Sequence, residues 1–227
     1  MTPAVEVEGL TRRFGRRWAL RGVDLEVPSG IVVALLGANG TGKTTLLRVL
    51  STLLRPTAGR VRVLGQLLPG GGGGAPEAVA GTDRVRERTA LMTPGGHAYE
   101  ELTGLENLRF AALMSGLSLE DAELREALAA VRLDQAGDTR VRAYSTGMRK
   151  RLELARVGQR ALDLVLLDEP FVSLDEEGVE LVQDAITGWR SDGAAVIVAS
   201  HRVPEATRHA DLVVRLDGGI VAESGPA

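Results

Sequence analysis

Several common features are missing from this 227-residue sequence, and each absence narrows the range of functions. There are no cysteines, which excludes disulfide bonds and thiol catalysis and is typical of a cytoplasmic protein. No apolar run approaches the 18 residues that a membrane-spanning helix needs, and the N-terminus lacks the apolar segment of a signal peptide. We therefore expect a chain that does not cross a membrane by itself.

The sequence also has a small net charge and few aromatic residues. The formal net charge is −3, so composition gives no signal for binding nucleic acid or an anionic membrane. Hydrophobic residues make up 44% and charged residues 25%, which is ordinary for a globular protein. The basic residues are nearly all arginine, and the only lysines are Lys43 and Lys150. Lys43 belongs to the central motif of the sequence.

Lys43 lies in a phosphate-binding loop, G-x-x-x-x-G-K-[ST], which the chain matches at every fixed position. The apolar run 31–36 enters the loop as a predicted buried strand, and residues 45–50 leave it as a predicted helix. Glycines allow successive backbone N–H groups to face one anion, and the helix adds its positive N-terminal end. Because loop, strand and helix agree, a chance glycine-rich turn is disfavoured.

This motif predicts that the chain binds ATP with Mg²⁺. Lys43 would reach the β- and γ-phosphates, and the Thr44 hydroxyl would ligate the metal. A compact ammonium on a flexible stem suits a phosphate site better than a planar guanidinium. The expected nucleotide-binding residues of this segment are Gly37, Ala38, Asn39, Gly40, Thr41, Gly42, Lys43, Thr44 and Thr45.

A second group of polar residues follows two other apolar strands. Residues 164–167 form an apolar run that ends in Asp168 and Glu169, and the apolar run 194–199 ends in Ser200 and His201. Ligands bind at the carboxyl ends of strands in a parallel α/β sheet. Asp168 fits a Mg²⁺ partner, Glu169 fits the carboxylate that polarises an attacking water, and His201 could bond the γ-phosphate. The alternatives are an acidic helix cap and a structural histidine.

Phe14 precedes the phosphate loop and has two readings. It could stack on an adenine ring, or it could be a hairpin aromatic packed on a small β layer, and the sequence does not separate them. Trp18 is the weaker candidate for adenine stacking.

The rest of the chain alternates between strands and helices. Short alternating strands fill residues 4–30, and a strand follows over 60–64. Residues 69–76 contain five consecutive glycines and predict a surface loop without chemistry. Residues 100–160 are mainly helical and begin with capping-box spacing at Thr103 and Glu106. A helix over 176–190 and a hairpin over 212–222 complete the second half.

Taken together, these motifs resemble the ATP-binding subunits of ABC transporters over nearly the whole chain. Residues 144–152, Tyr-Ser-Thr-Gly-Met-Arg-Lys-Arg-Leu, are similar to the signature segment of that family, usually Leu-Ser-Gly-Gly-Gln. Ser145 and Gly147 match, whereas Tyr144, Thr146 and Met148 depart from it. The resemblance implies that Ser145, Thr146, Gly147 and Met148 face the γ-phosphate of ATP on the opposite subunit. A helix N-terminus starting at a serine is physically suited to an anion.

The resemblance extends to three other positions and fails at one. Residues 173–175, Ser-Leu-Asp, match the dimer-contact loop with Asp175, His201 matches the switch histidine, and Phe14 stands at the adenine-stacking position. The family usually has a glutamine before the helical tract that ligates Mg²⁺ and couples ATP to the membrane partner. Residues 92–99, Met-Thr-Pro-Gly-Gly-His-Ala-Tyr, contain none. This departure bears on hydrolysis rate and coupling, and not on nucleotide binding.

The resemblance implies an α/β fold of the ABC-type P-loop NTPase class. We expect a mainly parallel sheet, a small antiparallel β layer and a helical subdomain. One domain would span 1–227, with the α/β core at about 1–89 and 159–227 and the helical subdomain at about 90–158. Two such chains, or a pseudo-dimer of cassettes, would close head to tail around two ATP molecules. Each ATP site would contain Ser145 and Gly147 from the neighbouring cassette.

The implied function is an ATP hydrolase that powers export through separate transmembrane permease subunits. Such a chain would be cytoplasmic and peripheral on the inner face of the cell membrane, with no nucleic acid partner. Residues 102–110 and 143–145 look most like the haem-exporter ATP-binding subunit of cytochrome c maturation, the CcmA type. Antibiotic and polysaccharide exporter ATPases share much of this pattern. A soluble ABC-type ATPase of DNA repair or translation, or a nucleotide-dependent module with little hydrolysis, are the alternatives.

Overall fold

The structure is a computed structural model that describes residues 3–70 and 76–227, without the side chains of 76–80. The chain divides into two compact units. The first unit consists of the residues up to Leu91, together with Leu162–Glu169 and Ile186–Ala227. The second unit consists of Met92–Ala161 and Pro170–Ala185. The predicted helical segment falls mainly within the second unit, which also includes residues 170–185.

A six-stranded, mostly parallel sheet forms the centre of the first unit, as predicted. In order across the sheet, the strands are β10 (Ile220–Pro226), β9 (Leu212–Asp217), β3 (Val32–Leu36), β8 (Ala195–Ser200), β7 (Leu164–Asp168) and β6 (Thr89–Met92). The neighbours β9, β3, β8 and β7 run parallel, and β10 joins β9 as an antiparallel hairpin. Every residue of β3, β7 and β8 is buried, which explains their continuous apolar sequences.

The register of this sheet brings three strand ends to one edge. Leu36 of β3 pairs with Ser200 of β8, and Asp168 of β7 pairs with Ala199. The residues that follow these strands, Gly37 and His201 among them, therefore start at nearly the same level.

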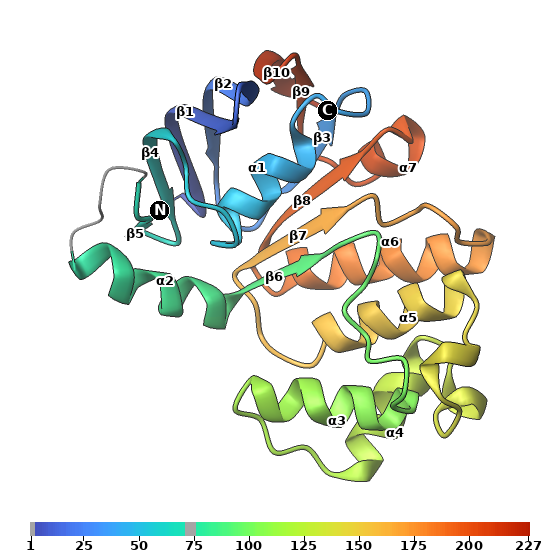
Figure 1. Ribbon diagram of the computed structural model, residues 1–227. Helices are drawn as coiled ribbons and strands as arrows, with labels where there is room; N and C mark the ends of the chain where they lie inside the picture. The colour runs from blue at the N-terminus through green and yellow to red at the C-terminus, as the bar shows by residue number, and fades with distance from the viewer. Residues whose placement is uncertain (1–2, 71–75) are drawn as a thin grey trace. The chain divides into compact units, whose positions relative to one another are not determined.

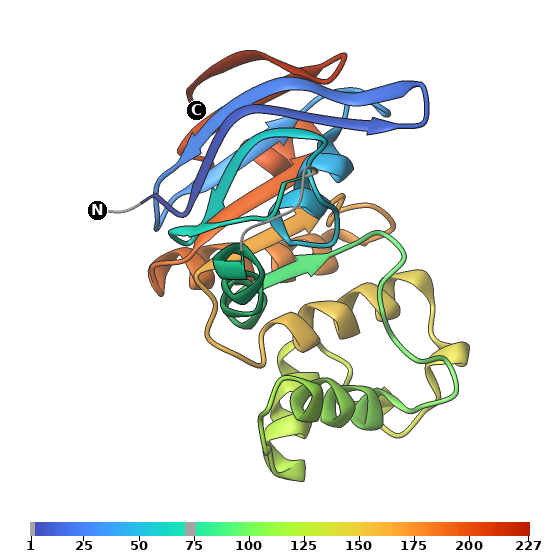
Figure 2. The ribbon, with the colours of Figure 1, turned by 60° about the vertical axis from the view of Figure 1, so that its left-hand side comes forward.

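The smaller sheet of the first unit is antiparallel and also agrees with the prediction. Its order is β2 (Arg17–Val27), β1 (Val5–Phe14), β4 (Ala58–Val63) and β5 (Gln66–Leu67). The strands β1 and β2 form the long hairpin drawn in blue in Figure 2. Register shifts in β1 near Leu10 and Arg12 mark irregular pairing, which bends a strand and increases its twist.

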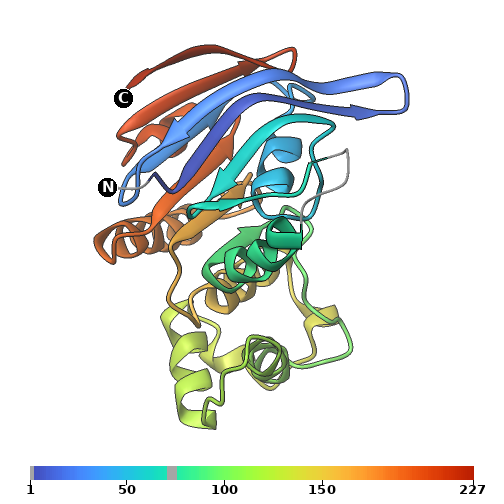
Figure 3. The ribbon, with the colours of Figure 1, turned by 90° about the vertical axis from the view of Figure 1, so that its left-hand side faces the viewer.

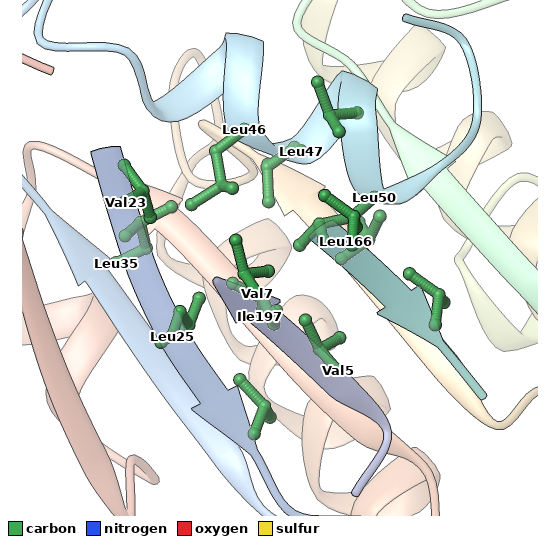
Figure 4. Close-up of a cluster of buried hydrophobic side chains, with 14 of the residues drawn as sticks. Val5, Val7, Val23, Leu25, Leu35, Leu46, Leu47, Leu50, Leu166 and Ile197 are labelled. Atoms are coloured by element: carbon green, nitrogen blue, oxygen red, sulfur yellow. The ribbon is translucent and has the colours of Figure 1, made fainter. Parts of the chain in front are cut away.

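Helix α1 (Lys43–Leu50) lies between the two sheets and joins their cores (Figure 1). Its side chains Leu46, Leu47 and Leu50 are fully buried. Figure 4 shows them in one cluster with residues from both sheets, including Val5 and Val7 of β1, Val23 and Leu25 of β2, Leu35 of β3, Leu166 of β7 and Ile197 of β8. Burying a Leu side chain contributes about 1.5–3 kcal/mol, so this cluster fixes the helix that follows the phosphate loop.

The remaining helices of the first unit are α2 (Pro76–Arg88) and α7 (Val203–Thr207). The alternating arginines at 84–88 lie in α2. The guanidinium of Arg88 donates to both carboxylate oxygens of Asp163, at 2.8 and 2.6 Å. The glycine-rich segment 69–76 was predicted to be a surface loop, and its residues 71–75 lie outside the described part of the chain.

The second unit is built from helices. They are α3 (Gly104–Met114), α4 (Asp121–Ala130), α5 (Thr146–Val157) and most of α6 (Glu176–Ser191), with short 3₁₀ turns at Asp134–Ala136 and Val141–Ala143. Helices α3, α4 and α5 pack against one another (Figure 3). The predicted capping box is present, because Thr103 accepts from the backbone of Glu106 and the Glu106 carboxylate accepts from the backbone of Thr103. No helix in the described residues is long and apolar enough to span a membrane.

Candidate nucleotide site

The phosphate loop, residues 37–42, connects β3 to α1 as the sequence predicts. A Cβ at Gly37 would lie 2.4 Å from the carbonyl oxygen of Leu216, and a Cβ at Gly42 would lie 2.7 Å from that of Ala19. Gly42 also has φ of 113°, which side-chain-bearing residues rarely adopt. The loop backbone is therefore packed so closely that only glycine fits at these two positions.

The Lys43 side chain folds back over this loop and is 6% exposed. Its ammonium donates to the carbonyl oxygens of Gly37 at 2.6 Å and Ala38 at 3.2 Å, and it lies 3.8 Å from a carboxylate oxygen of Glu169. The Thr41 hydroxyl also donates to Ala38, at 2.9 Å. A single ammonium is thus held between the loop and the carboxylate at the end of β7, where a phosphate group could replace the carbonyl contacts.

Asp168 ends β7 and is 2% exposed. Burial raises the pKa of its carboxyl, a hydrogen bond with Thr44 lowers it, and the neighbouring charge of Glu169 raises it again. One carboxylate oxygen, Oδ1, is buried without a hydrogen-bond partner in the described part of the chain. A buried acceptor without a donor is costly, so this oxygen is suited to a cation or to water held by a cation.

These observations fit a Mg²⁺ ion shared with a nucleotide. No group of three or more His, Cys, Asp or Glu side chains could hold a metal alone in the residues that the structure describes. Mg²⁺ commonly takes one or two protein oxygens and completes its shell with phosphate oxygens and water. Thr44 and Asp168, which lie close enough for Thr44 to lower the pKa of the Asp168 carboxyl, supply such a partial set.

Glu169 occupies an unusual backbone conformation and makes a compact hydrogen-bond cluster. Its φ is 50°, a left-handed value that is uncommon for glutamate and typical of strained functional positions. Its Oε2 accepts from the Ser200 hydroxyl at 3.2 Å and from the backbone N–H of His201 at 3.4 Å, and it lies 2.9 Å from Nδ1 of His201. The structure therefore brings the predicted Glu169 and His201 together and adds Ser200, whose role the sequence did not single out.

Phe14 lies at the end of β1, in the same unit, and its side chain is 45% exposed. The guanidinium of Arg12 lies 4.6 Å from the centre of its ring, and that of Arg13 lies 5.2 Å from the Trp18 ring. Phe14 is therefore a hairpin aromatic with nearly half of its side chain exposed, and it presents surface on which a base could stack.

In the second unit, the predicted signature segment begins α5. Ser145 is the N-cap, and its hydroxyl accepts from the backbone N–H of Met148 at 3.2 Å. A Cβ at Gly147 would lie 3.3 Å from the carbonyl oxygen of Ser173, so the segment packs closely on the loop that contains Asp175. The two segments line an open hollow of about 530 Å³, whose residues are Ser145, Thr146, Gly147, Met148, Arg151, Ser173, Asp175 and Glu177.

Arg151 joins the signature helix to this second segment. It donates to Asp175 at 2.8 Å and lies 3.2 Å from Glu177, which also pairs with Arg132. The hydrogen bond from Arg151 is the largest cause that lowers the pKa of Asp175. The Asp175 carboxylate also accepts from the backbone N–H of Gly178 at the start of α6. The sequence showed Arg151 within the signature but gave no signal of its partners, because they lie more than 20 residues away.

The segment without the expected glutamine is held by a buried carboxylate. Glu153 of α5 is 1% exposed, and its Oε2 accepts from the backbone of His97 at 3.3 Å and from Arg156 Nε at 3.0 Å. Burial alone would raise the pKa of Glu153, but hydrogen bonds with His97 and Arg156 hold it below its usual value. His97 therefore anchors this segment to α5 through its backbone N–H.

Comparison with known proteins agrees with this geometry. The family profile described as "ABC transporter" matches residues 20–172. A daunorubicin resistance ATP-binding protein, DrrA3 of Streptomyces coeruleorubidus, is 38% identical over 99% of this chain and 68% of its own length. The cytochrome c biogenesis ATP-binding export protein CcmA of Cupriavidus pinatubonensis is 34% identical over 88% of this chain and 84% of its own. A solved ATP-binding subunit of an ABC transporter has a TM-score of 0.84 at 28% identity, covering 99% of this chain and 90% of that one.

Proposed function

This chain belongs to the ABC transporter family as an ATP-binding and ATP-hydrolysing subunit, and from this premise we propose that it powers export through a separate membrane partner. Because the chain spans about two thirds of DrrA3, the activity of the whole protein is part of the proposal. The observation that carries it is the single edge of the first unit where the phosphate loop, Asp168, Glu169 and His201 meet.

In this proposal, the phosphate loop holds the triphosphate and Phe14 stacks on the adenine. The backbone N–H groups of residues 37–45 and the Lys43 ammonium bind phosphate oxygens. Thr44 and Asp168 hold Mg²⁺, which when bound would neutralise charge on the β- and γ-phosphates. The unpaired Oδ1 of Asp168 supports that assignment.

Glu169 is the proposed base, which orients the attacking water and accepts its proton. The water oxygen forms a bond to the γ-phosphorus as the bond to the β-phosphate oxygen breaks, leaving ADP and phosphate. Ser200 and His201 hold the Glu169 carboxylate, and His201, whose side chain is 51% exposed, can turn to the γ-phosphate.

We test this assignment with Glu169→Gln, which keeps the size of the side chain and removes the base. Because general-base catalysis contributes roughly 10²–10⁴-fold, turnover should fall at least about 100-fold while ATP affinity is retained. The exposed Glu26→Gln, on β2, is the matched control and should keep its turnover. Full turnover in Glu169→Gln would refute the role of this carboxylate.

We propose that two cassettes close around two ATP molecules through the signature segment. Ser145, Thr146, Gly147 and Met148 line an open hollow in the second unit, together with Arg151, Ser173, Asp175 and Glu177. The free N–H groups at the start of α5 suit the γ-phosphate of the neighbouring cassette. Hydrolysis removes that phosphate and its contacts, which reopens the dimer.

An exposed apolar surface on the second unit supports a membrane partner. Tyr99, Phe110, Leu113 and Met114 are 54%, 39%, 62% and 72% exposed, and the rings of Tyr99 and Phe110 pack edge to face at 4.9 Å. Large exposed apolar side chains that gather on one surface mark interaction sites. We propose that a transmembrane permease covers this surface and places the chain on the inner face of the cell membrane.

The partner proposal has a direct test. Leu113→Ser and Met114→Ser together should leave the ATP turnover of the isolated chain unchanged and abolish copurification with the transmembrane permease that the unmodified chain retains from solubilised membranes. Leu53→Ser, which alters an exposed leucine of the first unit, is the control that keeps copurification. Unchanged copurification of the double variant would refute this surface as the docking site.

For the cargo, we favour a small-molecule drug over haem. DrrA3 is more similar than CcmA and aligns with more of this chain, 99% against 88%. Cargo contacts belong to the membrane partner, so efflux of daunorubicin and of haem by membrane vesicles that contain both subunits would decide between them.

The missing glutamine in residues 92–99 supports one further candidate, a subunit that binds ATP and hydrolyses it only with its partner attached.

A further inference from the structure

Arg17 carries an unpaired guanidinium beside the phosphate loop. It is the first residue of β2 and is exposed. Its Nη2 lies 3.6 Å from the position that a Cβ would take at Gly40, in the middle of the loop. In residues 3–70 and 76–227 this guanidinium has no hydrogen bond or ion pair.

The backbone fixes the position of Arg17 relative to the loop. The carbonyl oxygen of Ala19 lies 2.7 Å from the Cβ position at Gly42, and a methyl carbon of Leu20 lies 2.8 Å from it. Arg21 also donates its backbone N–H to Gly219 at 2.8 Å. The start of β2 is therefore packed against the loop, and the approach of Arg17 does not depend only on a flexible side chain.

The local charge favours an anion at this place. Residues 12–17 are Arg-Arg-Phe-Gly-Arg-Arg, with four cations and no acidic residue. Arg12 and Arg13 face the Phe14 and Trp18 rings, whereas Arg16 and Arg17 have no such contact. Clustered cations attract anions, and a guanidinium offers paired donors to phosphate oxygens.

We propose that Arg17 is a nucleotide-binding residue that donates to phosphate oxygens of the ATP held by residues 37–44. The proposal rests on the nucleotide site proposed above and adds to it a second cation besides Lys43. Arg17 would act in binding and in the discrimination of ATP from less charged nucleotides. Phe14, which pairs with Arg17 in the hairpin, would serve the base of the same nucleotide.

The experiment compares Arg17→Ala, Arg17→Lys and the control Arg16→Ala in the full chain. Dissociation constants for Mg²⁺-ATP, ADP and AMP are measured by calorimetry at low and high salt, and thermal unfolding without nucleotide checks the fold. Arg17→Ala should weaken ATP binding about tenfold, equivalent to about 1.4 kcal/mol. The effect should be smaller for ADP, absent for AMP and reduced by salt. Arg16→Ala should stay within about twofold, since an exposed unpaired cation contributes little.

Arg17→Lys should recover part of the ATP affinity, because it keeps the charge and loses the planar pair of donors. The proposal is overturned if Arg17→Ala binds ATP like wild type, if Arg16→Ala is equally impaired, or if the loss is the same for AMP. Lys43→Ala separates the two proposals. Loss of binding in Lys43→Ala with no effect of Arg17→Ala rejects only this inference, whereas normal binding in Lys43→Ala rejects the nucleotide site itself.

Discussion

The buried carboxylate of Glu153 predicts which of two substitutions lowers the free energy of unfolding more, Arg156→Met or Glu153→Gln. Replacing Arg156 by Met keeps the apolar stem and leaves the Glu153 charge, 1% exposed, with His97 alone. Breaking a buried ion pair by removing one partner costs about 3–5 kcal/mol. Glu153→Gln removes the charge instead, and its former partners are 29% and 50% exposed, so water can solvate them. We expect about 1.5–3 kcal/mol for that loss, the range of a hydrogen bond to a charged group.

The assay is urea unfolding of the nucleotide-free chain at pH 7, followed by circular dichroism. Arg156→Met should therefore lower the free energy of unfolding more than Glu153→Gln. Arg125→Met breaks the exposed pair with Asp138 and serves as control, with a loss of about 1 kcal/mol or less. A larger loss for Glu153→Gln than for Arg156→Met would show that the desolvated charge does not dominate this cluster.

The pH dependence follows from the lowered pKa of Glu153. A carboxyl with a lowered folded-state pKa contributes stability above its unfolded value, about 4.3, and this is lost as pH falls through the folded pKa. Without Arg156 the contribution disappears, because burial then raises the pKa. The difference between wild type and Arg156→Met should shrink on acidification from pH 7. A constant difference would contradict the electrostatic explanation.

Three shorter predictions follow. Gly42→Ala should abolish ATP binding in a calorimetric titration and cost about 2–4 kcal/mol in urea unfolding, since its Cβ would lie 2.7 Å from Ala19 O at a positive φ. Thr103→Ala should cost about 1 kcal/mol by loss of the N-cap of α3, and Thr103→Ser should restore most of it. Arg151→Met should raise the pKa of Asp175 in an NMR titration, because its hydrogen bond is the main cause that lowers it, and an unchanged pKa would refute that cause.

Local pattern was enough to predict the elements that carry the motifs. The apolar run 31–36, the loop and the helix after it appear as β3, residues 37–42 and α1. The strands that end at Asp168 and Ser200 are also present, as are the cap at Thr103 and the hairpin β9–β10. Each depends on neighbours within a few residues, so the sequence contains its full signal.

Contacts between distant segments could not be predicted in the same way. The Glu169 backbone conformation and its bond from Ser200 depend on the packing of β7 beside β8. Glu153 was one polar residue in a helix, and its burial with His97 follows from how the segment at 93–99 packs on α5. The proximity of Arg17 to Gly40 depends on the placement of the hairpin β1–β2. None of these leaves a periodic or motif signal in a single sequence.

The pairing of the central strands has a consequence for how this protein can vary. The phosphate loop begins after Leu36, which pairs with Ser200, and Asp168 pairs with Ala199 one step below. A strand advances about 3.3 Å per residue and alternates its side chains between two faces. Deleting one residue from β8 would therefore move His201 by that distance and turn Ser200 away from Glu169. These strands can exchange one apolar side chain for another, but their lengths cannot change without separating the groups at the site.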